Sequence, residues 1–232
     1  MDIMITLSAN AGVSIEIDHK RILIDAFPGN KTRGFSCVSE EYFNKLITNE
    51  HFMDPDLMIT SHRHADHFSA EYDKRIRELW PNMITADPGE TGRIELDGIT
   101  VKIADLPHEG SKYSRNPHSG ILISCRGRNI LIPADCAIGA KELTELIEGI
   151  PVDVALLDFP WITLRRGRKY IEETMQPREL IIYHIPFPED DINHYREAVN
   201  EAVNKALPVL PLMAPARIRI LADPRQTEII KL

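Results

Sequence analysis

The chain has 232 residues, of which 43% are hydrophobic and 27% charged, and this composition is typical of a folded protein with a sizeable core. Its formal net charge of −8 disfavours a nucleic-acid surface, because phosphate backbones are usually bound by basic faces. Its three cysteines include no C-x-x-C pair, so they indicate neither a disulfide framework nor a thiolate zinc site.

The length favours one domain over 1–232, or two fused halves. The first residues lack a basic leader followed by an apolar block, and no later stretch approaches the roughly 18 apolar residues of a membrane span. We therefore expect a cytoplasmic protein that binds neither membranes nor nucleic acid.

The first part of the chain is predicted to open with antiparallel strands and then to alternate helices with a buried strand. The predicted elements are strands at 3–7, 14–17, 21–24 and 57–60, a helix capped by Ser39 with Phe43, Leu46 and Ile47 on one face, and a helix capped by Ser69 with Tyr72, Ile76, Leu79 and Trp80 at helical spacing up to Pro81.

The second part repeats this order, with strands first and helices after them. The predicted elements are strands at 93–96, 100–103, 120–124 and 129–132, a helix with Leu143, Leu146, Ile147 and Ile150 on one stripe, strands at 152–157 and 179–183, a long helix from about Asp190 with Ile192, Tyr195, Val199 and Val203 inward, and a late strand at 217–221. Two β-rich halves, each with helices, predict an α+β four-layer αβ/βα sandwich, in which two mixed sheets pack face to face with helices outside.

A cluster of three histidines and an aspartate, H-R-H-A-D-H, follows the predicted strand 57–60. Neutral imidazoles and carboxylates are good ligands for zinc and similar divalent ions. In an extended stretch His62 and His64 point to the same side, whereas Asp66 and His67 follow the chain into the helix and can reach a second ion. One loop could therefore serve two metal ions.

This H-x-H-x-D-H loop resembles the signature of the metallo-β-lactamase superfamily. The other positions of that family pattern follow in order: Asp25, His108, Asp135 and His184, each near the end of a predicted strand. The family's usual Gly-Asp-Thr is Ala134-Asp135-Cys136 here, which keeps the aspartate. We expect Cys136 to be a buried structural thiol and not a ligand.

The resemblance implies a single catalytic domain that holds two divalent metal ions, with zinc expected and manganese or iron as alternatives. It implies that His62, His64 and His108 hold one ion, that Asp66, His67 and His184 hold the other, and that Asp135 bridges both. Asp25 would lie behind the ligands. A hydroxide shared by the two ions would attack the substrate. Asp66 is either a plain ligand or a catalytic residue that orients this nucleophile or handles its proton.

The polar loop 109–119 supplies candidate substrate contacts: Lys112, Tyr113, Arg115 and His118. These side chains could bind an anionic group of the substrate. A solvated loop without a role is an equal alternative. The basic run 165–169 could contact substrate, but a surface or a subunit contact is favoured for a short charge run, and a homo-oligomer is possible.

Within the superfamily, the chain is similar to the compact hydrolases grouped around the L-ascorbate-6-phosphate lactonase. This similarity implies a hydrolase for a small, anionic molecule such as a lactone, an ester or a phosphorylated metabolite. Two alternatives remain: a phosphodiesterase or ribonuclease of the same superfamily, which the acidic balance disfavours, and a non-catalytic metal-binding or sensing module.

Overall fold

The computed structural model describes residues 2–29, 31–113, 115–206 and 217–231. The chain forms two compact units. Unit 1 comprises Met1–Pro88, His184–Asn193 and Leu221–Leu232, and unit 2 comprises Gly89–Tyr183 and His194–Ile220. The prediction of a single domain over 1–232 stays a prediction.

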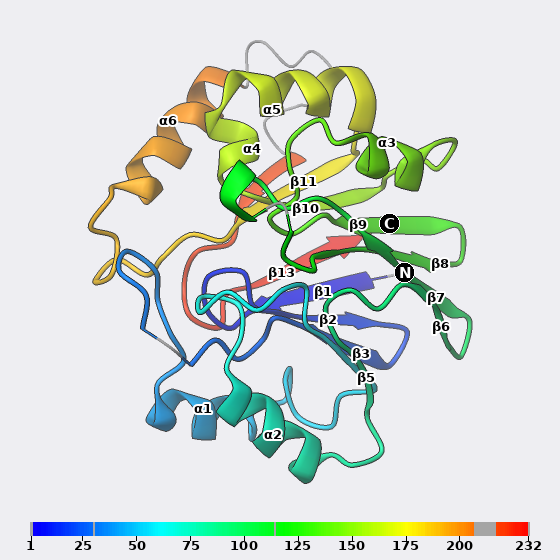
Figure 1. The fold of residues 1–232 in the computed structure, drawn as a ribbon, viewed down its shortest axis with the longest axis vertical. Coiled ribbons are helices and arrows are strands. Elements are labelled where there is room, and N and C mark those ends of the chain that lie inside the picture. Colours follow the sequence, from blue (N-terminus) through cyan, green and yellow to red (C-terminus); the bar gives the residue numbers. More distant parts are fainter. Residues whose placement is uncertain (1, 30, 114, 207–216, 232) are drawn as a thin grey trace. The chain divides into compact units, whose positions relative to one another are not determined.

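Unit 1 is built on a six-stranded mixed sheet with the order β13-β1-β2-β3-β4-β5 (Figure 1). Its strands are β1 (Asp2–Leu7), β2 (Val13–Ile17), β3 (Lys20–Ile24), β4 (Leu57–Ile59), β5 (Ile84–Ala86) and β13 (Thr227–Lys231). The strands β1 to β3 form an antiparallel meander, and β4 and β5 run parallel to β3. The carboxyl ends of β3, β4 and β5 therefore lie at one edge of the sheet, where functional residues of such sheets gather.

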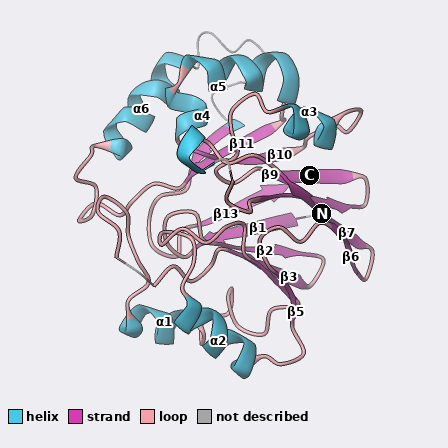
Figure 2. Cartoon of the chain, in the orientation of Figure 1, coloured by secondary structure: helices cyan, strands magenta, loops and turns pink. Residues whose placement is uncertain are grey.

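Two helices, α1 (Glu40–Leu46) and α2 (Ala70–Leu79), lie side by side on one face of this sheet (Figure 2). Each begins at the predicted serine, because the Ser39 and Ser69 hydroxyls accept a backbone N–H from the third residue of their helices. The rings of Phe43 and Tyr72 stack between the helices with centroids 4.3 Å apart.

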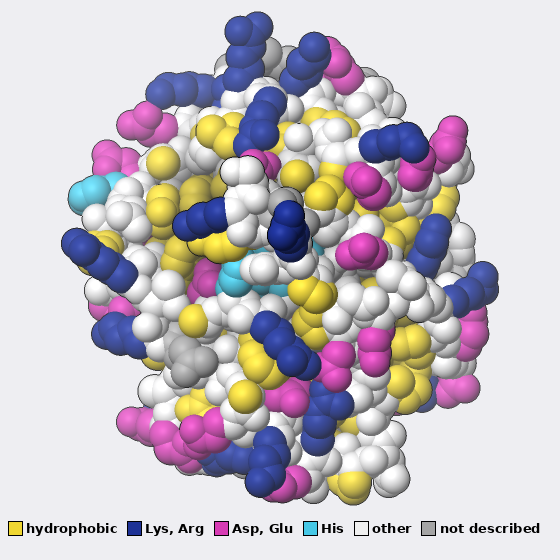
Figure 3. Space-filling view, in the orientation of Figure 1, with side chains coloured by type: hydrophobic (Ala, Val, Ile, Leu, Met, Phe, Trp, Pro, Cys, Tyr) yellow, Lys and Arg dark blue, Asp and Glu magenta, His cyan; other side chains and the backbone are white. Residues whose placement is uncertain are grey.

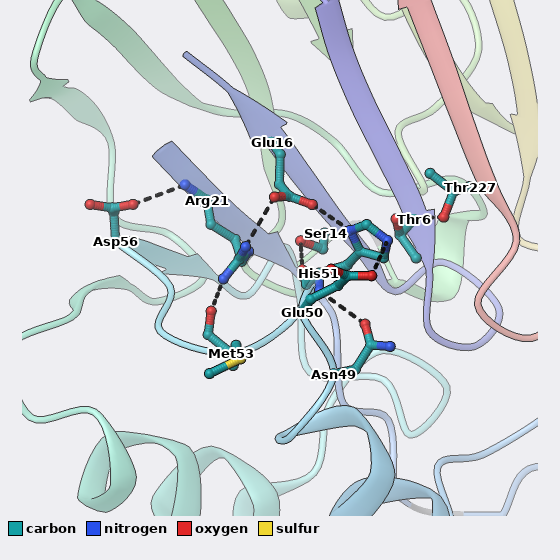
Figure 4. A network of polar contacts seen from close by, with 10 residues as sticks. All are labelled: Thr6, Ser14, Glu16, Arg21, Asn49, Glu50, His51, Met53, Asp56 and Thr227. Carbon is teal, nitrogen blue, oxygen red and sulfur yellow. Dashed lines mark hydrogen bonds and ion pairs between the residues drawn. The ribbon is translucent and has the colours of Figure 1, made fainter. Parts of the chain in front are cut away.

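A polar network fastens the loop before β4 to the strands β2 and β3 (Figure 4). The Nδ1 atom of His51 lies 2.7 Å from Oε1 of Glu16, and Arg21 donates to the other oxygen of Glu16 at 3.0 Å. Asp56 accepts the backbone N–H of Arg21 at 2.9 Å. These contacts lie at the amino end of β4, so they hold the strand in register from the end opposite the histidine cluster.

Unit 2 is built on a seven-stranded mixed sheet with the order β12-β11-β10-β9-β8-β7-β6. Its strands are β6 (Gly92–Leu96), β7 (Ile99–Asp105), β8 (Ser119–Cys125), β9 (Arg128–Ile132), β10 (Val154–Asp158), β11 (Glu179–Tyr183) and β12 (Ile218–Ile220). The strands β6 to β9 are antiparallel, whereas β9 to β12 run parallel. The carboxyl ends of β9, β10 and β11 thus share one edge of this sheet.

Helices α4, α5 and α6 lie on one face of the unit 2 sheet (Figure 1). The helical elements of this unit are η1 (Ser111–Tyr113), α3 (Lys141–Ile147), α4 (Pro160–Thr163), α5 (Arg165–Tyr170), a π-helical turn η2 (Ile171–Met175) and α6 (Tyr195–Ala206). Gly167 allows α4 and α5 to approach closely, because a Cβ atom there would come within 2.3 Å of the Trp161 carbonyl oxygen.

Two mixed sheets with helices confirm the predicted fold class, and each predicted strand and helix is present within a few residues of its expected bounds. The elements that were missed are the strands β5 and β13 and the short helical segments η1, α4, α5 and η2. Leu79 and Ile192 were expected on inward faces but are 49% and 52% exposed. Leu79 is the last residue of its helix, and α6 begins after Ile192, so neither side chain is held against a core.

Among the described residues, no helix is long and apolar enough to cross a membrane.

Candidate metal centre

The histidine cluster lies on a short loop of unit 1 that is fixed at both ends. Thr60 donates its backbone N–H to the Ala86 carbonyl of β5 at 3.0 Å, and Ser61 donates its N–H to Asp25 Oδ1 at 2.7 Å. The carbonyl of His64 then accepts the N–H groups of His67 and Phe68 at 3.0 and 2.9 Å, which closes a tight turn before α2. The sequence thus builds a rigid loop between a buried strand and a capped helix, as predicted.

Asp25 and His67 form a buried pair behind this loop. Asp25 Oδ2 lies 2.9 Å from His67 Nδ1 and accepts the Ser61 hydroxyl at 2.5 Å. Because a carboxylate only accepts hydrogen bonds, we assign the His67 proton to Nδ1, which leaves Nε2 as the nitrogen that can bind a metal. Asp25, His62 and His67 each offer one ligand atom, and these atoms lie within 4.8 Å of one another.

Asp66, His67 and His184 form a second group of the same kind, also with ligand atoms within 4.8 Å of one another. His184 Nε2 lies 3.2 Å from Asp66 Oδ2, and the ring of His184 stacks on Phe35 with centroids 5.1 Å apart. His184 takes a left-handed backbone conformation, with φ at 59°, and donates its N–H to the Asn10 carbonyl at 3.0 Å. Its imidazole is therefore oriented by both its backbone and its ring contact.

His62 and His64 lie against each other, with Nε2 of His62 3.1 Å from Nδ1 of His64. His62 is fully buried, whereas His64 is partly exposed, and Figure 3 shows histidine side chains reaching the surface. Two ring nitrogens this close can share a proton or face one cation. The position of His64 makes this part of the loop open to solvent.

The donor chemistry of unit 1 fits divalent metal ions. The two groups combine imidazole nitrogens with carboxylate oxygens, which suits zinc, iron and manganese, and they share His67. Buried imidazole rings oriented by a carboxylate, as in the contact of His67 with Asp25, are a recurrent feature of metal sites.

Unit 2 brings His108 and Asp135 together through its backbone. The segments 107–109 and 135–137 pair by main-chain hydrogen bonds, including Glu109 N–H to Asp135 O at 2.8 Å and Ala137 N–H to Pro107 O at 2.7 Å. His108 Nδ1 lies 2.7 Å from the Glu109 carbonyl oxygen, and its Nε2 lies 3.6 Å from Asp135 Oδ2. The imidazole thus presents Nε2 toward the carboxylate of Asp135.

Asp158, the last residue of β10, also lies beside Asp135, with carboxylate oxygens of the two residues within 4.8 Å. Asp158 was not among the predicted site residues. The signal was present, because Asp158 ends a buried strand parallel to the one that precedes Asp135. Burial raises the pKa of the neighbouring Cys136 thiol far above its usual value, and the charge of Asp158 adds to this shift. Cys136 is a buried thiol, as predicted.

The four candidate substrate residues of loop 109–119 lie in different environments. His118 is fully buried, with Nδ1 3.1 Å from the Leu106 carbonyl oxygen and its ring centroid 5.3 Å from that of His108. The Tyr113 ring lies 5.1 Å from His108, and Lys112 Nζ lies 4.4 Å from the Tyr113 ring centroid. Arg115 is exposed and lines a hollow of about 380 Å³.

The basic run 165–169 is the helix α5. Arg168 donates to the Ile162 and Thr163 carbonyls at 2.7 and 2.9 Å and so closes the end of α4. Arg166 pairs with Glu109 at 2.9 Å. Burial alone would raise the pKa of the Glu109 carboxyl, but Arg166 and the N–H of Ile138 hold it below its usual value. Part of the run therefore has a structural role.

Solved structures resemble the chain closely in fold and weakly in sequence. A metallo hydrolase from Ignicoccus hospitalis aligns over 100% of both chains, with a TM-score of 0.65 and 17% identity. The metallo-β-lactamase fold protein YhfI from Bacillus subtilis covers 98% of this chain and 99% of its own, with a TM-score of 0.57 and 12% identity. CmlA, a diiron β-hydroxylase from Streptomyces venezuelae, aligns with 99% of this chain over 54% of its own, with a TM-score of 0.64 and 14% identity. No family model matches the sequence, and no curated protein matches it.

Proposed function

Because the chain has the metallo-β-lactamase fold, we propose that it is a hydrolase that uses two divalent metal ions per chain. The observation that carries this proposal is the group Asp66–His67–His184 in unit 1, whose ligand atoms lie within 4.8 Å of one another, with Asp25 behind it at His67 Nδ1. A structural histidine needs one hydrogen-bond partner, whereas these imidazoles converge with carboxylates at the carboxyl ends of parallel strands.

The proposed ligands are those that the sequence resemblance assigns: His62, His64 and His108 for one ion, Asp66, His67 and His184 for the other, and Asp135 for both. His108 is supported by its orientation, since its Nδ1 contacts a backbone carbonyl and its Nε2 faces Asp135. Zinc is the ion we expect first, with manganese or iron as alternatives.

Divalent ions held by this set would supply a hydroxide nucleophile near neutral pH and would stabilise the developing oxyanion. The residues have separate tasks. Asp25 holds the proton of His67 at Nδ1 and fixes its ring. Asp66, whose Oδ2 lies 3.2 Å from His184 Nε2, is proposed either as a plain ligand or as the carboxylate that orients the nucleophile or accepts its proton.

The proposed substrate is a small anionic molecule, such as a lactone, an ester or a phosphorylated metabolite. A net charge of −8 and the mixture of acidic and basic side chains on the face drawn in Figure 3 favour a small substrate over a nucleic acid. Arg115, Lys112 and Tyr113 are proposed contacts for its anionic group. His118 would act through His108, because it is buried next to that ring.

The first experiment is elemental analysis of the purified protein and of three alanine variants, of His62, His184 and the exposed His194. We expect about two transition-metal ions per chain in the wild type. The ion content should fall in the His62 and His184 variants and stay unchanged in the His194 control. Lactones, esters and phosphoesters are then screened with the metal that was found. A wild-type protein that binds no metal after reconstitution at neutral pH would overturn the proposed function.

A further inference from the structure

Unit 2 offers a carboxylate that the ligand set above does not use. Asp158 ends β10, and Asp135 follows β9, the parallel neighbour of β10. The register pairs Val154 with Ile130 and Ala155 with Leu131, so its continuation brings Asp158 level with the turn that carries Asp135. The two side chains have carboxylate oxygens within 4.8 Å of each other.

Asp158 is 8% exposed, so water screens its carboxylate little. The carboxylate of Asp135 lies within 4.8 Å, and two like charges repel each other where water is largely excluded. A divalent cation between them would turn the repulsion into attraction.

An imidazole accompanies the carboxylate of Asp135. His108 presents Nε2 toward Asp135 at 3.6 Å, and the Glu109 carbonyl oxygen at 2.7 Å from its Nδ1 fixes the ring. In unit 2 the carboxylate of Asp135 thus faces the imidazole of His108, and it also lies within 4.8 Å of the carboxylate of Asp158. Imidazole nitrogens and carboxylate oxygens are the donors found in metal sites.

We infer that Asp158 is an additional ligand of one of the two metal ions proposed to share Asp135, and that it makes this ion's surroundings richer in oxygen. The inference rests on the proposed function, because it concerns the same metal centre. Carboxylate-rich sites suit manganese better than sites with more nitrogen ligands do. Asp158 would therefore raise the affinity for Mn²⁺ more than the affinity for Zn²⁺.

The test compares Asp158→Asn with the wild type, each stripped by a chelator and titrated with Mn²⁺ while electron paramagnetic resonance follows the free ion. We expect the dissociation constant for Mn²⁺ to rise by about 10- to 100-fold. The constant for Zn²⁺, measured by competition with a chelating dye, should rise less. Asp105→Asn, at the exposed end of β7 in the same unit, is the matched control and should bind both ions as the wild type does.

Urea unfolding of the metal-free proteins distinguishes a metal ligand from a residue that only stabilises the fold. Removing one of two neighbouring like charges should leave the metal-free Asp158→Asn protein at least as resistant to urea as the wild type. A variant that loses stability without metal, or that binds Mn²⁺ with wild-type affinity, would overturn the inference. If Asp135→Asn loses metal and Asp158→Asn does not, the proposed function stands and the role of Asp158 fails. If the wild type binds neither ion, both fail.

Discussion

Replacing Asp25 by Asn tests whether the buried carboxylate behind the loop controls metal binding. Asp25 accepts three hydrogen bonds, from the Ser61 N–H at 2.7 Å, the Ser61 hydroxyl at 2.5 Å and His67 Nδ1 at 2.9 Å. Asn keeps one acceptor oxygen and turns an NH₂ group toward the remaining donors. Its backbone is not strained by the exchange, because Asn tolerates the left-handed conformation that Asp25 adopts, with φ at 48°.

The expected losses of unfolding free energy and of metal affinity follow from these contacts. Hydrogen bonds to a charged group are worth about 1.5–3 kcal/mol each, so the metal-free variant should lose about that much unfolding free energy. Loss of the carboxylate behind a metal-binding histidine typically costs about 10- to 100-fold in affinity, which is about 1.4–2.7 kcal/mol. Both effects come from freeing the His67 ring and the Ser61 backbone.

The assay is competition for Zn²⁺ with a chelating dye, accompanied by urea unfolding of the metal-free proteins. The matched control is Asp56→Asn. Asp56 also accepts a backbone N–H in unit 1, from Arg21, but it lies at the opposite end of β4 (Figure 4). The Asp56→Asn variant should lose stability and keep the metal affinity of the wild type. An Asp25→Asn protein that binds Zn²⁺ within twofold of the wild type would refute the role given to Asp25.

Three further results are expected. Burial raises the pKa of Tyr42 from 10.0 to about 12, so stability should fall as the pH rises from about 10 through 12, by about 3 kcal/mol in all. Tyr42→Phe should remove this fall in urea midpoints. The two hydrogen bonds from Arg75 lower the pKa of Glu40, so the stability lost in Glu40→Gln should disappear as the pH falls through the lowered value, and also in 1 M salt. Ala134 has φ at 50°, so Ala134→Gly should be neutral or raise stability by up to about 1 kcal/mol in the same assay; a clear loss would argue against backbone strain there.

The loop of unit 1 was predictable because all its signals are local. Three signals follow one another within about a dozen residues: a buried strand, a run of ligand-type residues and the serine cap of α2. Each signal determines the structure of the short segment in which it lies. His184 could be proposed only from the family pattern, since its position in unit 1 depends on a backbone bond to Asn10, distant in the sequence.

The elements that were missed lack a local signal. The strand β5 has three residues, and its pairing with β4 supplies the hydrogen bonds that make it a strand. The helix α5 has no apolar stripe, and its sequence reads as a charged loop until Arg168 is seen to bind the end of α4. His118 looks like part of a polar loop, but it is buried because it directly precedes β8 and binds the backbone of Leu106. Tertiary contacts decide all three cases.

The division of unit 1 along the chain has a consequence for biosynthesis. A ribosome that has made residues up to Pro88 has produced Asp25, the histidine loop and both helices of this unit, but not His184. The 95 residues of Gly89–Tyr183 are translated before that histidine appears. Under the proposed ligand set, an emerging chain can thus offer the Asp66–His67 pair only without its third member, and an incomplete set holds an ion weakly. Secure metal capture would therefore wait until His184 has been translated.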